Sequence, residues 1–162
     1  MTLRIIKLLL FACILGLFIG CVNASNKKLI IGDSHVGGIK WAVPNAPVMY
    51  KNGSTINYWL NVKPIRNIDN LYIMTGTNDY RHNISPKSWY SNTQKLCKKW
   101  QPKHCYVVAP PRNSDWRYVK YREELMDKPN VRWTNTNDKT RDGTHFYRNT
   151  YKDFYYQIII NY

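Results

Sequence analysis

The stretch Leu29-Ile-Ile-Gly-Asp-Ser-His-Val-Gly-Gly38 joins an apolar run to a cluster of polar residues and two glycines. An apolar run that stops at such a cluster is typical of a buried strand that turns into a helix. Asp33 and Ser34 are good helix N-caps, so structure alone could explain them. They also place a hydroxyl at the end of a strand. A nucleophile there would need a base, an orienting acid and oxyanion donors from elsewhere in the chain.

Apolar, β-rich runs recur along the chain and alternate with longer amphipathic segments. We expect five strands, at Lys28–Ile31, Val48–Tyr50, Leu71–Met74, Cys105–Ala109 and Val131–Thr134. The expected helices cover Val36–Ala42, Pro86–Trp100, Trp116–Met126 and Thr150–Ile160. This alternation predicts an α/β fold, a three-layer α/β/α sandwich around a five-stranded parallel sheet. In such sheets ligands bind beyond the carboxyl ends of the strands.

The first 24 residues are typical of a secretory signal peptide. A basic start is followed by an uninterrupted apolar run from Leu8 to Val22, and these 15 residues are too few for a membrane span, which needs about 20. Small residues up to Ala24 fit signal-peptidase cleavage before Ser25. The sequence therefore predicts export to the periplasm, the cell envelope or the exterior.

Cleavage would leave one domain, residues 25–162, with two of the four cysteines, Cys97 and Cys105. In an exported chain such a pair favours a disulfide, whereas in a reducing compartment both would be free thiols. Two alternatives keep the protein at a membrane. The N-terminal segment could stay as an uncleaved anchor, or Cys21, which lies in an imperfect lipobox, could carry a lipid.

The chain is strongly basic, with 24 Lys and Arg against 10 Asp and Glu and a net charge of +14. Such a charge attracts polyanions. Export argues against nucleic acid as a partner and favours an anionic envelope polymer. A solvated cationic surface without a specific partner explains the charge equally well.

Four short polar clusters follow strands or occupy loops. They are Gly32-Asp-Ser34, Asn52-Gly-Ser-Thr55, Gly76-Thr-Asn-Asp79 and Asp142-Gly-Thr-His145. Taken singly, each is explained by a cap, a turn or a strand end. Taken together, they fall on loops at one edge of the predicted sheet, which favours a shared site.

These clusters resemble, in order, the blocks of the SGNH or GDSL-type hydrolases, a family of esterases named for Ser, Gly, Asn and His. GTND and DGTH match closely, the glycine block matches most loosely, and the resemblance extends over roughly residues 28–160. It implies a flavodoxin-like SGNH hydrolase fold. No GxSxG surrounds Ser34, which argues against the other large serine-esterase fold.

The resemblance implies a role for each matching residue. Ser34 would be the nucleophile, His145 the general base and acid, and Asp142 the residue that fixes the imidazole tautomer. The backbone N–H groups of Ser34 and Gly53 and the side-chain amide of Asn78 would form the oxyanion hole. We expect no cofactor and no metal, because nothing in the sequence resembles a metal cage or a nucleotide-binding loop.

Other polar residues near these blocks have weaker functional interpretations. His35 could be proposed as the base, but neighbours on a turn that leads into a helix point apart. Asp33 and Asp79 are better interpreted as hydrogen-bond acceptors that fix loops, and His82 and His104 as surface residues. A GDSH form of the first block occurs in relatives that act on polysaccharide O-acetyl groups, including acyltransferases.

The leading hypothesis is a secreted serine esterase that removes an acyl group, most plausibly acetyl, from an envelope or extracellular carbohydrate, although another small ester would also fit. The alternatives are an O-acyltransferase with the same triad and a non-catalytic protein that binds polyanions on this fold. The many tyrosines and tryptophans could stack on sugar rings, or could equally belong to the core.

Overall fold

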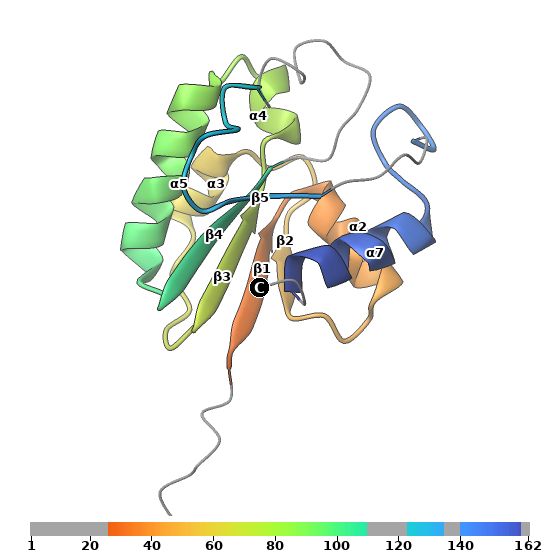
Figure 1. Cartoon of the computed structure of the whole chain (residues 1–162), viewed down its shortest axis with the longest axis horizontal. Helices are drawn as coiled ribbons and strands as arrows, with labels where there is room; N and C mark the ends of the chain where they lie inside the picture. The colour runs from red at the N-terminus through yellow and green to blue at the C-terminus, as the bar shows by residue number, and fades with distance from the viewer. Residues whose placement is uncertain (1–25, 110–122, 135–139, 160–162) are drawn as a thin grey trace, which may run out of the picture.

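A computed structural model describes residues 26–109, 123–134 and 140–159 (Figure 1). The predicted signal peptide at 1–24 lies outside the described residues. So does the first part of the helix predicted at 116–126. Residues 124–126 are described and form a turn, so no helix extends to Met126.

A five-stranded sheet forms the centre of the domain. Its strands are β1 (Lys28–Gly32), β2 (Val48–Tyr50), β3 (Asn70–Met74), β4 (His104–Ala109) and β5 (Val131–Trp133). All neighbouring pairs are parallel, in the order β2-β1-β3-β4-β5. Gly32 is in register with both Tyr50 and Met74, so β1, β2 and β3 end at the same level. The predicted parallel α/β sheet is confirmed, and its carboxyl edge carries the first three polar clusters.

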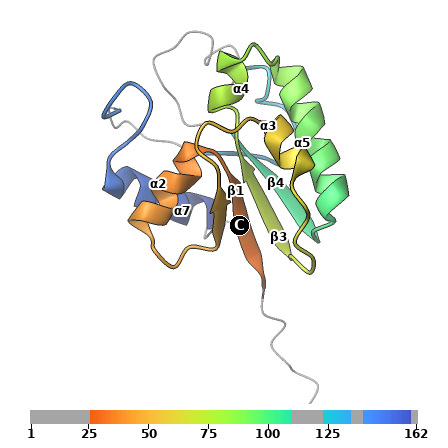
Figure 2. The same cartoon turned by 180° about the vertical axis from the view of Figure 1, so that it is seen from behind.

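Helices cover both faces of the sheet, as the predicted three-layer sandwich requires. The described helices are α2 (Ser34–Ala42), α3 (Ile56–Asn61), α4 (Thr77–Arg81), α5 (Pro86–Trp100) and α7 (Arg148–Ile159). Figures 1 and 2 show α2 and α7 side by side on one face, with α3 and α5 on the other. Helices α3 and α4 were not predicted, because one or two turns contain too few residues for a recognisable apolar period.

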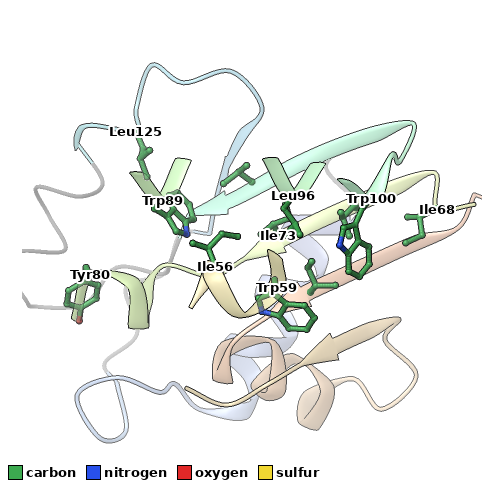
Figure 3. Close-up of a cluster of buried hydrophobic side chains, with 12 residues drawn as sticks. Ile56, Trp59, Ile68, Ile73, Tyr80, Trp89, Leu96, Trp100 and Leu125 are labelled. Atoms are coloured by element: carbon green, nitrogen blue, oxygen red, sulfur yellow. The ribbon is translucent and has the colours of Figure 1, made fainter. Parts of the chain in front are cut away.

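Two apolar cores separate these layers. Under α3 and α5, three tryptophans pack with aliphatic residues of the strands (Figure 3); the cluster includes Ile31, Ile56, Trp59, Leu71, Ile73, Trp89, Leu96, Trp100 and Val107. Under α2 and α7, the core includes Ile30, Val36, Ile39, Tyr72, Met74, Val108, Phe146, Tyr151 and Phe154. Strand β3 is buried along its whole length, since both cores cover it.

Helix α5 shows how the sequence encodes one of these layers. Ser85 caps its first turn by accepting a hydrogen bond from the Ser88 N–H, and Pro86 occupies the first helical position, where no N–H is required. The helix buries a stripe at helical spacing, which consists of Trp89, Thr93, Leu96 and Trp100. The stripe rests on the sheet and fixes the position of the last helical turn.

Cys97 in that last turn forms the predicted disulfide with Cys105 in β4, with the two Cα atoms 5.9 Å apart. The bond ties the carboxyl end of α5 to the start of β4. Because the polar clusters lie at the opposite ends of the strands, this disulfide is a structural link remote from them.

Replacing both cysteines by alanine should destabilise the fold without affecting the polar clusters. Closing a loop of 8 residues reduces the entropy of the unfolded chain by an amount worth about 2.5 kcal/mol. We expect the Cys97→Ala/Cys105→Ala protein to lose roughly that free energy of unfolding in urea titrations. Unchanged stability would contradict the assigned role of this bond.

Candidate active site

Ser34 is the first residue of α2 and is separated from the end of β1 only by Asp33, at the carboxyl edge of the sheet. Asp33 is the N-cap, and its Oδ1 accepts from the His35 N–H at 3.0 Å. Gly32 is required by close packing, since a Cβ there would lie 1.9 Å from the Met74 carbonyl oxygen. The turn therefore fixes the position of the Ser34 hydroxyl at the carboxyl edge of the sheet.

His145 lies beside Ser34, although 111 residues separate them in the chain. Its Nε2 is 2.9 Å from Ser34 Oγ, and its Nδ1 is 2.9 Å from Asp142 Oδ2. With the hydrogen on Nδ1, the ring donates to the carboxylate and Nε2 accepts from the serine hydroxyl. The three residues that the sequence predicted as a triad thus form one continuous chain of hydrogen bonds.

The loop that carries His145 is shaped by Asp142. Its Oδ1 accepts from the backbone N–H groups of Thr144 and His145, at 3.0 and 2.7 Å. The bonds from the backbone and side chain of His145 hold the pKa of Asp142 well below its usual value. Gly143 has a φ of +82°, a conformation that favours glycine in this tight turn. Asp142 is therefore ionised at neutral pH and faces the imidazole.

The GTND block connects the three loops at this edge. Asp79 is fully buried, and its two carboxylate oxygens accept from the backbone N–H groups of Ile56 and Gly76, at 2.9 and 3.0 Å. Asn78 Nδ2 donates to the Ser54 carbonyl at 3.2 Å and lies 3.5 Å from an oxygen of Asp33. Asp79 is thus a loop-fixing acceptor, and the Asn78 amide lies between the β1 and β2 loops.

Most of the backbone N–H groups next to Ser34 are already bound within the turn. The N–H of His35 binds Asp33 Oδ1, and those of Val36 and Gly37 bind the Asp33 carbonyl. Within the described chain, the Ser34 N–H has no such acceptor, as expected for a first-turn amide at a helix N-terminus.

Gly53 lies in the neighbouring β2–α3 loop with a φ of +72°, and a Cβ there would meet open space. Glycine is therefore favoured at this position by the backbone conformation, and not by a close contact with neighbouring atoms. The structure brings Asn78 and Ser34 to one place, and it puts Gly53 on the loop beside them; the oxyanion role of all three remains a prediction.

His35 points away from Ser34 into the protein. It is 2% exposed, and its Nδ1 lies 3.1 Å from the Tyr151 hydroxyl, which also accepts from the Phe146 N–H at 3.3 Å. Burial, followed by the proximity of His145, lowers the pKa of His35 to about 3, so the ring is neutral and shares one hydrogen bond with the tyrosine hydroxyl. His35 and Tyr151 therefore support the backbone next to His145 from behind.

The remaining polar residues near the site have structural or surface positions. Burial raises the pKa of Asp33 to about 7 and that of Asp79 to about 6, and both carboxylates serve as acceptors within the loops. His82 and His104 are exposed. The described ranges contain no group of three or more His, Cys, Asp or Glu side chains that could hold a metal ion.

A cleft of about 280 Å³ opens beside the triad. It is lined by Ser34 and His145 and, further out, by Gly37, Gly38, Trp41, Tyr50, Asn52, Arg141, Phe146 and Tyr151. Sequence reasoning did not single out the outer residues. Trp41 could have been found, because Ser34, Gly37, Gly38 and Trp41 follow the i, i+3, i+4, i+7 spacing of one helix face. Tyr50 and Tyr151 carry no such signal.

Solved structures share this architecture at low sequence identity. A GDSL-family lipolytic protein from Veillonella parvula aligns with a TM-score of 0.58 and 12% identity, over 83% of this chain and 98% of that one. The fold is that of the SGNH/GDSL hydrolases. The resemblance stated from the four blocks is thus confirmed at the level of the fold.

Two further structures extend the comparison. A carbohydrate esterase of family 3 from Talaromyces cellulolyticus aligns with a TM-score of 0.59 and 16% identity, over 82% of this chain and 94% of that one. The C-terminal catalytic domain of peptidoglycan O-acetyltransferase A from Streptococcus pneumoniae aligns with a TM-score of 0.54 and 16% identity, over 82% and 90%. No protein-family model matches the sequence, and no curated protein matches it.

Acidification should lower the contribution of the buried, neutral His35 to the free energy of unfolding. Its folded pKa of about 3 lies below the ordinary value of 6.5, so its contribution to stability is complete above pH 6.5 and is lost as pH falls. Between pH 7 and pH 5 this loss amounts to about 2 kcal/mol. We expect urea unfolding at pH 7 and pH 5 to show that the His35→Gln protein lacks this loss in the free energy of unfolding.

The raised pKa values of Asp33 and Asp79 act in the opposite direction over this range. They are present in both proteins, so they cancel when the two pH dependences are subtracted. Identical pH dependence in the wild-type and His35→Gln proteins would show that His35 is not held neutral.

Proposed function

We propose that this protein is a serine esterase that hydrolyses a carboxylic ester, an O-acetyl group on an extracellular carbohydrate, through an acyl-enzyme on Ser34. The observation that carries the proposal is the continuous hydrogen-bonded chain Ser34–His145–Asp142, with 2.9 Å at each link. A hydroxyl is a poor nucleophile at neutral pH, and this arrangement supplies the base that it needs.

In the acylation step, Ser34 Oγ attacks the ester carbonyl carbon while His145 Nε2 takes the hydroxyl proton. The Asp142 carboxylate stabilises the imidazolium that forms. Negative charge develops on the carbonyl oxygen, and the Ser34 N–H, the Gly53 N–H and the Asn78 amide would be the donors that receive it. One hydrogen of that amide binds Ser54, and the other makes a long hydrogen bond of 3.5 Å to Asp33, which a carbonyl oxyanion would replace.

Collapse of this intermediate breaks the bond between the carbonyl carbon and the alcohol oxygen. His145 returns its proton to that oxygen, and the alcohol leaves. In the second half-reaction water attacks the acyl-enzyme, His145 takes its proton, and the carboxylate product departs as Ser34 regains its hydrogen. Each proton thus passes through Nε2, and no cofactor is required.

The shape of the site supports an oligomeric carbohydrate as the substrate. A second cleft, of about 550 Å³, borders the β2–α3 loop and includes Gly53, Tyr58 and His82. It shares Asn52 with the cleft beside Ser34. Two clefts that meet at the proposed oxyanion loop suit a chain of sugars that extends in both directions. The fold is also found in a carbohydrate esterase and in a peptidoglycan O-acetyltransferase domain.

Export rests on the N-terminal pattern and on the disulfide, which persists in oxidising compartments. We propose that residues 1–24 are removed and that residues 25–162 act in the periplasm, the envelope or the exterior. In the part of the chain that the structure describes, no helix has the length and apolar character needed to cross a membrane.

An O-acyltransferase is the second candidate, because the acylation step would be identical and a sugar hydroxyl would replace water. This second candidate is supported by the O-acetyltransferase domain that has the same fold. Purified residues 25–162 incubated with 4-nitrophenyl acetate should release acetate if the protein is a hydrolase. An added sugar acceptor should acquire the acetyl group if it is a transferase.

Ser34→Ala should reduce hydrolysis of 4-nitrophenyl acetate to background and abolish labelling by a fluorophosphonate probe, because both require the serine oxygen. Labelling is followed by intact mass, and circular dichroism verifies the fold. Ser88→Ala, on the exposed first turn of α5, is the matched control. Undiminished activity in Ser34→Ala would refute the acyl-enzyme mechanism.

Asn78→Ala should lower kcat for 4-nitrophenyl acetate by roughly 10²- to 10³-fold, the usual cost of losing one oxyanion donor. Asn92→Ala is the matched control, since Asn92 pairs with Asn57 on the exposed surface between α3 and α5. Full activity in Asn78→Ala would remove this residue from the oxyanion hole while leaving the role of Ser34 intact.

A further inference from the structure

Two large aromatic side chains of the cleft beside Ser34 are exposed to solvent. Trp41 is 52% exposed and Tyr50 is 47% exposed, whereas Trp59, Trp89 and Trp100 are buried in the core. Both exposed rings line the cleft that contains Ser34 and His145. Exposed aromatic surface that converges on a reactive group is typical of a ligand-binding site.

The position of Tyr50 is fixed by the helix opposite. A Cβ at Gly37 would lie 2.9 Å from the Tyr50 ring and 3.3 Å from Asn52 Oδ1. The ring and the amide therefore rest against the bare backbone of α2. A side chain at Gly37 would displace them, so the glycine keeps this wall of the cleft in place.

The same region carries guanidinium groups. The Arg148 guanidinium carbon lies 5.6 Å from the centre of the Trp41 ring, a cation–π contact that orients the indole and places a positive charge beside it. Arg141 lines the cleft directly. None of the described residues that line this cleft carries a carboxylate, although Arg141 lies 3.8 Å from Asp142 Oδ2. With Arg148 as a second guanidinium, positive charge exceeds negative charge in the outer part, which favours a negatively charged ligand.

We infer that Trp41, Tyr50, Asn52 and Arg148 form a subsite for a carboxylate-bearing sugar, so that the esterase acts on acidic glycans. A sugar ring presents apolar C–H groups to an aromatic face and hydroxyls to an amide, and its carboxylate would pair with Arg148. Trp41 and Tyr50 line the same cleft as Ser34. A sugar bound to the two rings would therefore bring its acetyl group close to the nucleophile. The placement of the acetyl group rests on the proposed function, but binding of the sugar does not.

Binding is tested first, without catalysis. The Ser34→Ala protein is titrated by calorimetry with oligogalacturonate, hyaluronan and alginate fragments, and with neutral xylo- and cello-oligosaccharides. We expect at least one acidic fragment to bind more tightly than every neutral one, and the binding to weaken as salt is raised. Adding Trp41→Ala should weaken it about ten-fold or more, the cost of losing one aromatic anchor. Adding Arg148→Gln should remove the preference for acidic fragments.

Matched controls use residues of the same types outside the cleft. Tyr156→Ala removes another exposed aromatic ring, and Arg66→Gln removes an exposed guanidinium that pairs with Gln101. Both should leave binding unchanged. If no acidic fragment binds, or if Trp41→Ala and Arg148→Gln bind like the controls, the subsite is refuted.

Catalysis is tested second, with an acetylated form of the bound glycan and with 4-nitrophenyl acetate. Trp41→Ala should lower kcat/KM for the glycan about ten-fold more than for the small ester, which carries no sugar to bind there. Equal losses on both substrates would refute a role in specificity. Sugar binding without any Ser34-dependent ester hydrolysis would instead refute the proposed esterase function and leave the subsite standing.

Discussion

The buried carboxylate of Asp79 is the interaction on which the site depends. It accepts from Gly76 in its own loop and from Ile56 at the start of α3, and so joins the ends of β2 and β3. Asn78, one residue earlier, reaches the β1 loop through Asp33 and the β2 loop through Ser54. The parallel sheet brings three loops to one edge, and this pair of side chains fixes them relative to one another.

The triad is assembled differently, by a loop from the far end of the chain. Asp142 shapes that loop through two backbone hydrogen bonds before it contacts the imidazole. The buried Tyr151 hydroxyl then binds the Phe146 amide from the other side. His145 is therefore positioned from both directions along its own backbone, which suits a group that must accept and return a proton without moving far.

Much of this fold could be predicted because the apolar runs and the polar clusters are local signals. The β1 run and GDS after it indicated both the strand and its end. GTND indicated Asn78, which contacts Asp33, and DGTH indicated His145, which contacts Ser34. Strand order could not be predicted, since it depends on which runs pair in space. The helices α3 and α4 are too short to show a period, and residues 124–126, which were expected to end a helix, form a turn. Tyr50 and Tyr151 join the site through packing against Gly37 and Gly38, which no spacing rule describes.

The two glycines of α2 also bear on how the site is stabilised. Each weakens an isolated helix by about 0.5 to 1 kcal/mol relative to alanine, so α2 depends on docking for its stability. A Cβ at Gly38 would lie 2.4 Å from the Tyr151 ring, which shows how closely α7 packs on it. Because α7 packs directly on this helix, the helix that carries Ser34 reaches its full stability only when α7 is docked. The loop that carries His145 leads into α7, so the nucleophile and its base are held in place by the same helix packing.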